Sequence, residues 1–196
     1  MVKPKKGERE KQPMKKQWWH NIPEEDYCYE SATSLATASI LLRGLPMLYQ
    51  GQETEADPAA AFYWLERAAE QGHPDAQCNC GMFCYNGIGT EPDLPQALLW
   101  FERAAEQGNR AAQFNCGLMY SEGQGTAKDL TRALRWFEKA AEQGHPDAQC
   151  NCGTFYFNGQ GTERDREKAK FWFGKAAAQG DEFAKQVLAE QFQEEG

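Results

Sequence analysis

The chain has 196 residues, 41% of them hydrophobic, and a formal net charge of -8. That length and apolar content suffice for one large folded domain or two small ones. The acidic balance argues against a nucleic-acid-binding protein, because such a protein needs a basic surface to displace counterions from phosphates. A mean hydropathy of -0.77 excludes a membrane-embedded protein. The odd count of seven cysteines excludes a disulfide set that pairs all of them.

The first seventeen residues form a basic segment, with seven Lys or Arg side chains against two Glu. No apolar run of the kind found in secretory signals follows it. The most apolar segment, residues 35–48, contains an arginine and a proline and is too short to span a bilayer. We therefore expect residues 1–20 to be a disordered basic tail and the protein to be cytoplasmic. The alternative is a tail that tethers the protein to acidic lipid or nucleic acid, with Trp18 and Trp19 at the interface.

A repeat dominates the rest of the chain. Four tryptophans stand 36 residues apart, at Trp64, Trp100, Trp136 and Trp172. They lie in the similar runs FYWLERAAEQG, LLWFERAAEQG, LRWFEKAAEQG and FWFGKAAAQG. A second block, AQCNCGMFCYNGIGT from Ala76, recurs from Ala112 and from Ala148 with few changes. A fixed period of about 20–50 residues is typical of a solenoid, so the repeat predicts the fold.

Each unit is predicted to contain two helices joined by a G-x-G-T loop. The first helix begins at equivalent positions in three units: Pro74, Arg110 and Pro146. Small or apolar residues recur along it at i, i+4 and i+8, which makes one helical stripe. The second helix is predicted to begin after an aspartate whose carboxylate caps free backbone N–H groups, at Asp57, Asp93, Asp129 and Asp165. It ends at a glycine such as Gly108, for which we expect a left-handed backbone conformation.

A glycine also recurs in the middle of the first helix, at Gly81, Gly117 and Gly153. Glycine there costs about 1 kcal/mol relative to alanine. Its recurrence predicts that another helix approaches so closely that a Cβ would clash.

These motifs, A-x-x-x-[LC]-G-x-x-[YC]-x-x-G-x-G-T-x-x-D and A-x-x-W-[FL]-x-[KR]-A-A-E-Q-G, resemble the Sel1-like repeat, a relative of the tetratricopeptide repeat. The resemblance implies an all-α fold, an α/α superhelical solenoid of about four and a half repeats of 36 residues. The solenoid domain is expected over residues 21–196. Its units are expected at 37–72, 73–108, 109–144 and 145–180, with a charged capping helix at 181–194; the first unit is degenerate.

The resemblance also implies a function. Members of the family are scaffolds or adaptors that bind proteins and are rarely enzymes, and the first helices are expected to line a concave face of a right-handed superhelix. One bacterial, cysteine-rich branch implies an alternative, a β-lactam-binding or weakly β-lactamase-like hydrolase. In that branch a cysteine of the first helix is bridged to one of the second helix. This sequence departs from that pattern, because its six repeat cysteines all fall on first helices: Cys78, Cys80, Cys84, Cys116, Cys150 and Cys152.

Those cysteines are interpreted as small core residues, since free cysteine is often buried. The alternatives are metal binding and redox switching. Cys78 and Cys80 point to different sides of a helix and cannot form a bridge, and two ligands do not complete a zinc site. His73 and His145 could act with a cysteine, but they share a turn position with Asn109, so a turn role is favoured.

Motifs of known active sites are missing. No serine has a lysine three residues later, as a penicillin-recognising serine enzyme requires. Zinc-protease and phosphate-loop patterns do not occur, and the G-x-G of each loop lacks the third glycine of a dinucleotide site. The recurring Glu66, Glu102 and Glu138 are expected to be solvated or to pair with a residue one helical turn away. We expect no enzymatic activity, no cofactor and no metal.

Residues of the first helix that vary between units are predicted to form the binding face for a protein or peptide partner. They are Asp75, Cys78, Met82, Tyr85, Asn86, Phe114, Leu118, Glu122, Asp147, Cys150, Phe157 and Asn158. We expect Asn86 and Asn158 to bond the backbone of an extended or helical peptide, and Asp75 and Asp147 to attract its basic flanks. The alternative is that one or two of these side chains face a neighbouring helix. The protein is expected to be a monomer that does not bind nucleic acid.

Overall fold

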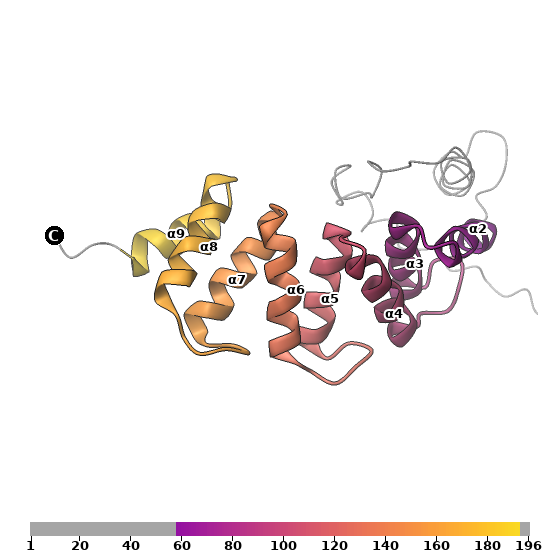
Figure 1. The fold of residues 1–196 in the computed structure, drawn as a ribbon, viewed down its shortest axis with the longest axis horizontal. Coiled ribbons are helices and arrows are strands. Elements are labelled where there is room, and N and C mark those ends of the chain that lie inside the picture. The colour runs from indigo at the N-terminus through magenta and orange to yellow at the C-terminus, as the bar shows by residue number, and fades with distance from the viewer. Residues whose placement is uncertain (1–57, 193–196) are drawn as a thin grey trace, which may run out of the picture.

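The computed structural model describes residues 58–192, which form eight α-helices and no strand (Figure 1). The helices are α2 (Pro58–Glu70), α3 (Pro74–Asn86), α4 (Leu94–Glu106), α5 (Arg110–Glu122), α6 (Leu130–Glu142), α7 (Pro146–Asn158), α8 (Arg166–Ala178) and α9 (Glu182–Gln191). The predicted all-α solenoid is confirmed. The basic tail, the first helix of the first unit, Asp57 and Cys28 lie outside the described residues.

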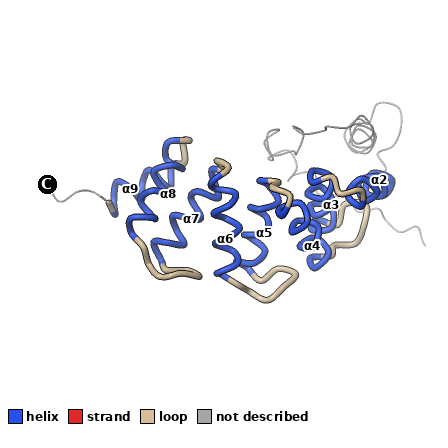
Figure 2. The backbone as a smooth tube through the Cα atoms, viewed as in Figure 1, coloured by secondary structure: helices blue, strands red, loops and turns tan. Residues whose placement is uncertain are grey.

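Each helix packs mainly on its neighbours in the chain, so the described part of the molecule is a row that runs from α2 to α9 (Figure 1). The longer loops join α3 to α4, α5 to α6 and α7 to α8 within a unit, whereas tight turns connect one unit to the next (Figure 2). The apolar core is continuous along this row because every unit contributes the same set of alanine, cysteine and aromatic side chains. We call α3, α5 and α7 the first helices of their units, and α2, α4, α6 and α8 the second helices.

Side chains at the helix starts confirm the predicted caps. The Asp93, Asp129 and Asp165 carboxylates accept from backbone N–H groups three residues later, at 2.9, 2.9 and 3.0 Å. These bonds use donors that an α-helix leaves free in its first turn. His145 and Asn109 occupy the cap position before first helices, and each accepts from a backbone N–H. Both therefore have the turn role that was favoured for this position.

The mid-helix glycines lie directly under phenylalanine rings of the second helix. A Cβ on Gly81 would come within 2.6 Å of Phe101, and one on Gly117 within 2.5 Å of Phe137. The rings are 1% exposed, so they have no space into which to retreat. The predicted close approach of two helices is confirmed, and its cause is an aromatic ring packed on bare backbone.

The second glycine of each loop has a role that the sequence reading missed. Gly125 has a φ of 69°, and a Cβ there would come within 2.5 Å of the carbonyl of Leu94 at the start of α4. Each such loop therefore rests on the beginning of the second helix of the unit before it, and glycine is needed both for the backbone angle and for the space.

Buried glutamines connect the helix ends, which the sequence reading also missed. The amide of Gln113 in α5 donates to the carbonyl of Ala105 at 3.1 Å, and its oxygen accepts from Gln143 at 2.7 Å. Gln143 follows α6, so one buried side chain joins the carboxyl ends of two successive second helices. The same pair of bonds recurs at two other units, through Gln77 with Gln107 and through Gln149 with Gln179. We call these six residues the glutamine row.

Candidate functional site

The residues of the predicted binding face all lie on the first helices α3, α5 and α7. Glu122, Asp147 and Asn158 are exposed there. Six other predicted residues are half-buried along the same face: Met82, Tyr85, Asn86, Phe114, Leu118 and Phe157. We call the side of α3, α5 and α7 that carries these nine residues the first-helix face.

Two predicted residues do not belong to an open surface. Asp75 is 8% exposed and Cys78 is 2% exposed. The Asp75 carboxylate accepts a hydrogen bond from the amide of Asn109 at 3.0 Å, so the next unit's turn covers it. The expectation that these two side chains face a partner was wrong, because the start of a first helix is packed against the unit that follows.

Phe114 and Cys150 stand at the position equivalent to Cys78 and also face the next turn. The Phe114 ring stacks on the imidazole of His145 with ring centroids 4.3 Å apart. Cys150 is half-buried beside Asp181; burial and that carboxylate raise the pKa of its thiol to about 12. Four of the predicted residues, Asp75, Cys78, Phe114 and Cys150, therefore pack near the next unit or within the core, more than the one or two that the alternative allowed.

The remaining side chains have mixed surroundings. Tyr85 donates its hydroxyl to Gln124 at 2.9 Å, and Asn86 donates to the carbonyl of Met82 in its own helix. The side-chain amide of Asn86 therefore already has one hydrogen bond within its own helix. Met82 and Leu118 are half-buried apolar side chains packed against the core, which leaves part of each exposed to a partner.

Three asparagines on this face were missed by the sequence reading. Asn79, Asn115 and Asn151 recur one per unit, two residues before the mid-helix glycine, and all three are half-buried. Among the described residues, the only bond of their amides is a 3.8 Å contact from Asn115 to the sulfur of Met82. The same residue type occurs at this position in all three units, on a face where the other positions vary. That invariance was the signal from which the sequence could have predicted them.

Charge is distributed unevenly between the two kinds of helix. The first helices carry three acidic residues, Asp75, Glu122 and Asp147, and one basic residue, Arg110. Most of the Lys and Arg side chains of the described residues lie instead on α4, α6 and α8. The first-helix face is therefore polar, weakly acidic and interrupted by apolar side chains.

The six described cysteines are free thiols, and five are buried. Burial raises the pKa of Cys80, Cys116 and Cys152 far above the usual range, with further contributions from nearby glutamates. Burial, with Asp93 and Glu66, raises the pKa of Cys84 to about 11. These four thiols therefore stay protonated at neutral pH and are poor nucleophiles and metal ligands. Within residues 58–192 no three His, Cys, Asp or Glu side chains gather at a point that could hold a metal ion.

Glutamates of the second helices have partners that the sequence reading did not foresee. The hydroxyl of Tyr120 donates to Glu102, and that of Tyr156 donates to Glu138. The expectation of solvation or pairing within one helix was wrong for these two, because a first-helix tyrosine of the following unit reaches back to them. Burial and the bond to Glu102 raise the pKa of Tyr120, whereas Arg132, which donates to the same hydroxyl at 3.3 Å, lowers it.

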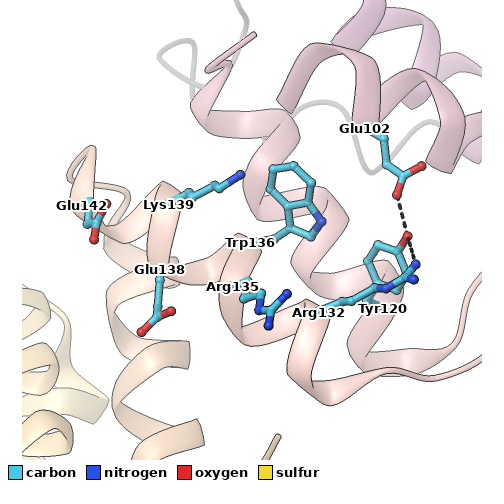
Figure 3. Close-up of a pocket in the computed structure, with 8 residues that line it drawn as sticks. All are labelled: Glu102, Tyr120, Arg132, Arg135, Trp136, Glu138, Lys139 and Glu142. Carbon is cyan, nitrogen blue, oxygen red and sulfur yellow. Dashed lines mark hydrogen bonds between the residues drawn. The ribbon is translucent and has the colours of Figure 1, made fainter. Parts of the chain in front are cut away.

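The same residues line a pocket of about 470 Å³ between α4 and α6 (Figure 3). Its walls carry Glu102, Tyr120, Arg132, Arg135, Trp136, Glu138, Lys139 and Glu142. The Trp136 ring stands between the Tyr120–Glu102–Arg132 cluster on one side and Lys139 on the other (Figure 3). The lining has no cysteine, serine or histidine. We assign it no chemistry.

No helix of the described residues combines the length and the apolar composition that crossing a bilayer would need.

The comparisons with known proteins agree with this architecture. The Sel1 repeat family model matches four successive units, residues 44–73, 74–109, 110–145 and 146–181. No curated protein sequence matches the chain.

Solved structures give the same result. The chain is 35% identical, with a TM-score of 0.76 over 80% of its length, to c5321, a protective antigen of uropathogenic Escherichia coli strains with an SLR fold. It is 33% identical, with a TM-score of 0.69 over 78% of its length, to a Sel1 repeat protein from Oxalobacter formigenes. It spans 33% of the first protein and 62% of the second.

A third likeness shows the fold alone. Cysteine rich protein B of Helicobacter pylori is 22% identical, with a TM-score of 0.53, over 71% of this chain and 100% of its own. Four matched units and two relatives with at least 33% identity lead to one conclusion. The chain belongs to the Sel1 repeat family, whose members are generally protein-interaction scaffolds.

Proposed function

We propose that this protein is a non-enzymatic scaffold that binds an extended peptide segment of a partner protein along its concave, first-helix face. The observation that carries the proposal is the row of Asn79, Asn115 and Asn151, one amide per unit on a face whose other positions vary. A carboxamide both donates and accepts, so each can bond a peptide group of an extended chain whatever the sequence of that chain.

The varying positions around the asparagines supply the selectivity. Met82 and Leu118 offer apolar contacts for anchor side chains of the peptide. Asp147 and Glu122 are exposed carboxylates that favour basic flanking residues. A partner segment with apolar anchors and Lys or Arg at its ends therefore fits this face best.

The test is a selection of random peptides displayed on phage against the full-length protein, followed by affinity measurements with the enriched peptide. Leu118→Glu and the double change Asn115→Ala with Asn151→Ala should each weaken that peptide's binding about tenfold or more, equivalent to about 1.4 kcal/mol. The enriched sequences should contain apolar residues near basic ones.

Leu99→Glu is the matched control for Leu118→Glu, because Leu99 is a 40% exposed leucine on the second helix α4. It should leave the affinity unchanged. Circular dichroism checks that every variant is folded. Peptide binding that survives both first-helix changes in folded protein would rule out this face as the binding site.

A further inference from the structure

The second helix α8 differs in charge from its counterparts. It carries Arg166, Lys168, Lys170 and Lys175 but only one acidic residue, Glu167, although the whole chain has a net charge of -8. The equivalent helix α4 has one basic and two acidic residues in its sequence LPQALLWFERAAE. All four cations of α8 are exposed.

Packing does not account for this difference. Gly174 stands where α4 has Glu102 and α6 has Glu138, and a Cβ at Gly174 would have nothing within 4 Å. A glutamate would therefore fit. Phe192 replaces the tyrosine that bonds those glutamates in earlier units, which explains why a glutamate has no structural role at 174. The change from tyrosine to Phe192 does not explain why α8 carries Lys168 and Lys170.

The lysines are also poorly neutralised. Lys168 lies 3.8 Å from Asp165 with both side chains largely exposed, a pair of little energetic weight. Lys170 and Lys175 form no ion pair with any carboxylate of residues 58–192. On α4 one cation and on α6 three cations share the helix with two glutamates, whereas the four cations of α8 share it with Glu167 alone.

An exposed aromatic ring lies among these cations. Phe171 is 54% exposed. Its ring meets Trp172 edge to face at 5.0 Å, and the Lys175 ammonium lies 4.7 Å from its centroid. The ring is thus fixed by a buried neighbour yet open to solvent. A preorganised aromatic side chain of this kind gives much binding energy at small entropic cost.

We propose that Lys168, Lys170, Phe171 and Lys175 form a second docking surface, the α8 surface, for an acidic segment of a partner protein in which an apolar residue lies between carboxylates. The apolar residue packs on Phe171 and the carboxylates pair with the lysines on either side of it. Discrete carboxylates suit the site better than a polyphosphate or an anionic membrane, because Glu167 lies among the cations and the acidic protein repels a uniformly charged polyanion. This surface lies on a second helix, so it is separate from the first-helix face.

The probe is a fluorescein-labelled peptide in which glutamates flank a single leucine, titrated with full-length protein at near-physiological salt and followed by anisotropy. Phe171→Ala and the double change Lys170→Glu with Lys175→Glu should each weaken binding about tenfold. A peptide with serine in place of the leucine should bind as weakly as the Phe171 variant. Leu99→Ala, at the same register on α4, and Lys128→Glu, an exposed lysine before α6, are the controls that should have no effect.

Three results would overturn the proposal. The first is that the wild-type protein does not bind the leucine peptide, or that the α8 variants bind it unchanged. The second is that phosphatidylserine vesicles or single-stranded DNA bind more tightly than the peptide and lose binding in the same variants. The third is that Leu118→Glu abolishes peptide binding, since the peptide would then occupy the first-helix face; Leu118→Glu has no effect if the α8 surface is the site.

Discussion

At the scale of single residues, glycines determine how closely the two helices of a unit approach. The Phe137 ring covers Gly117 where any side chain would occupy the same space, and the same geometry holds at Gly81 and Gly153. The helix tolerates the poor propensity of glycine because the buried ring contributes more than the roughly 1 kcal/mol that glycine costs.

Gly117→Ala should therefore destabilise the protein. Its Cβ would lie 2.5 Å from Phe137, and overpacking of a fixed core ring typically costs about 1–3 kcal/mol. Gly174→Ala is the matched control within α8, where a Cβ meets nothing within 4 Å and better helix propensity should add up to about 1 kcal/mol. Thermal denaturation of both variants measures the difference; equal shifts of Tm would contradict the packing role.

The sequence predicted these glycine contacts because the residue recurs against its own propensity. It could not predict which side chains at the Cys78 position would be covered. The next unit's cap residue supplies contacts here: His145 stacks on Phe114, Asp181 lies beside Cys150, and Asn109 at the same cap position bonds Asp75. The exposure of a side chain at the Cys78 position depends on the cap residue of the next unit as well as on the side chain itself. The pattern of residues along a single helix does not contain that information.

At the scale of the helices, the glutamine row joins elements that otherwise meet through apolar side chains. A helix leaves its last carbonyl groups without intrahelical partners. Gln113 donates a second hydrogen bond to one of these, the Ala105 carbonyl at the end of α4, which also accepts from the Gly108 N–H, and Gln113 is itself bonded by Gln143 at the end of α6. The row therefore fixes the ends of successive second helices relative to each other with directional bonds.

Gln113→Leu keeps the side-chain size but removes both bonds. It leaves the Ala105 carbonyl and the Gln143 amide without this partner, which should cost about 2–3 kcal/mol and lower Tm by about 5–10 °C. Gln186→Leu tests the same change on an exposed glutamine of α9, whose amide contacts only Glu190. If Gln113→Leu is as stable as Gln186→Leu, the row contributes nothing to stability.

At the scale of the whole molecule, the junctions between units are not equal. Tyr120 and Tyr156 bond a glutamate of the preceding unit, whereas the equivalent position in α3 is Cys84, which cannot reach Glu66 in the same way. Because the stability of a solenoid is close to a sum over units and junctions, the missing bond lowers the stability of the α2–α3 end.

Amide hydrogen exchange should report this gradient, with α2 and α3 exchanging faster than α5 and α6. Cys84→Tyr should slow exchange at that junction by adding a hydroxyl within reach of Glu66. Cys84→Phe separates the ring from the hydroxyl, so it should protect α3 less than Cys84→Tyr does. Uniform exchange from α2 to α7 in the wild-type protein would contradict a weaker first junction.

The overall architecture was predictable because one period sets caps, glycines and core together. The period could not reveal bonds that cross from unit to unit, such as those of Glu102 and of the glutamine row. The shared pattern also concealed the charge of α8, which is more basic than the other second helices. The asparagines of the first-helix face were overlooked for a related reason: a residue that is identical in every unit resembles a conserved packing residue, although these three are only half-buried.

The bonds of the glutamine row also govern how this chain can change length. Each buried glutamine reaches eight residues back and thirty residues forward. When one whole unit is removed or duplicated, every carbonyl and amide that loses its glutamine partner meets the equivalent glutamine of another unit. Every bond of the row can therefore form again. Adding or removing a single residue inside a helix turns a glutamine away from one of its two partners and leaves a buried amide unmatched. The architecture therefore permits growth and shortening by whole units, and it disfavours length changes inside the helices.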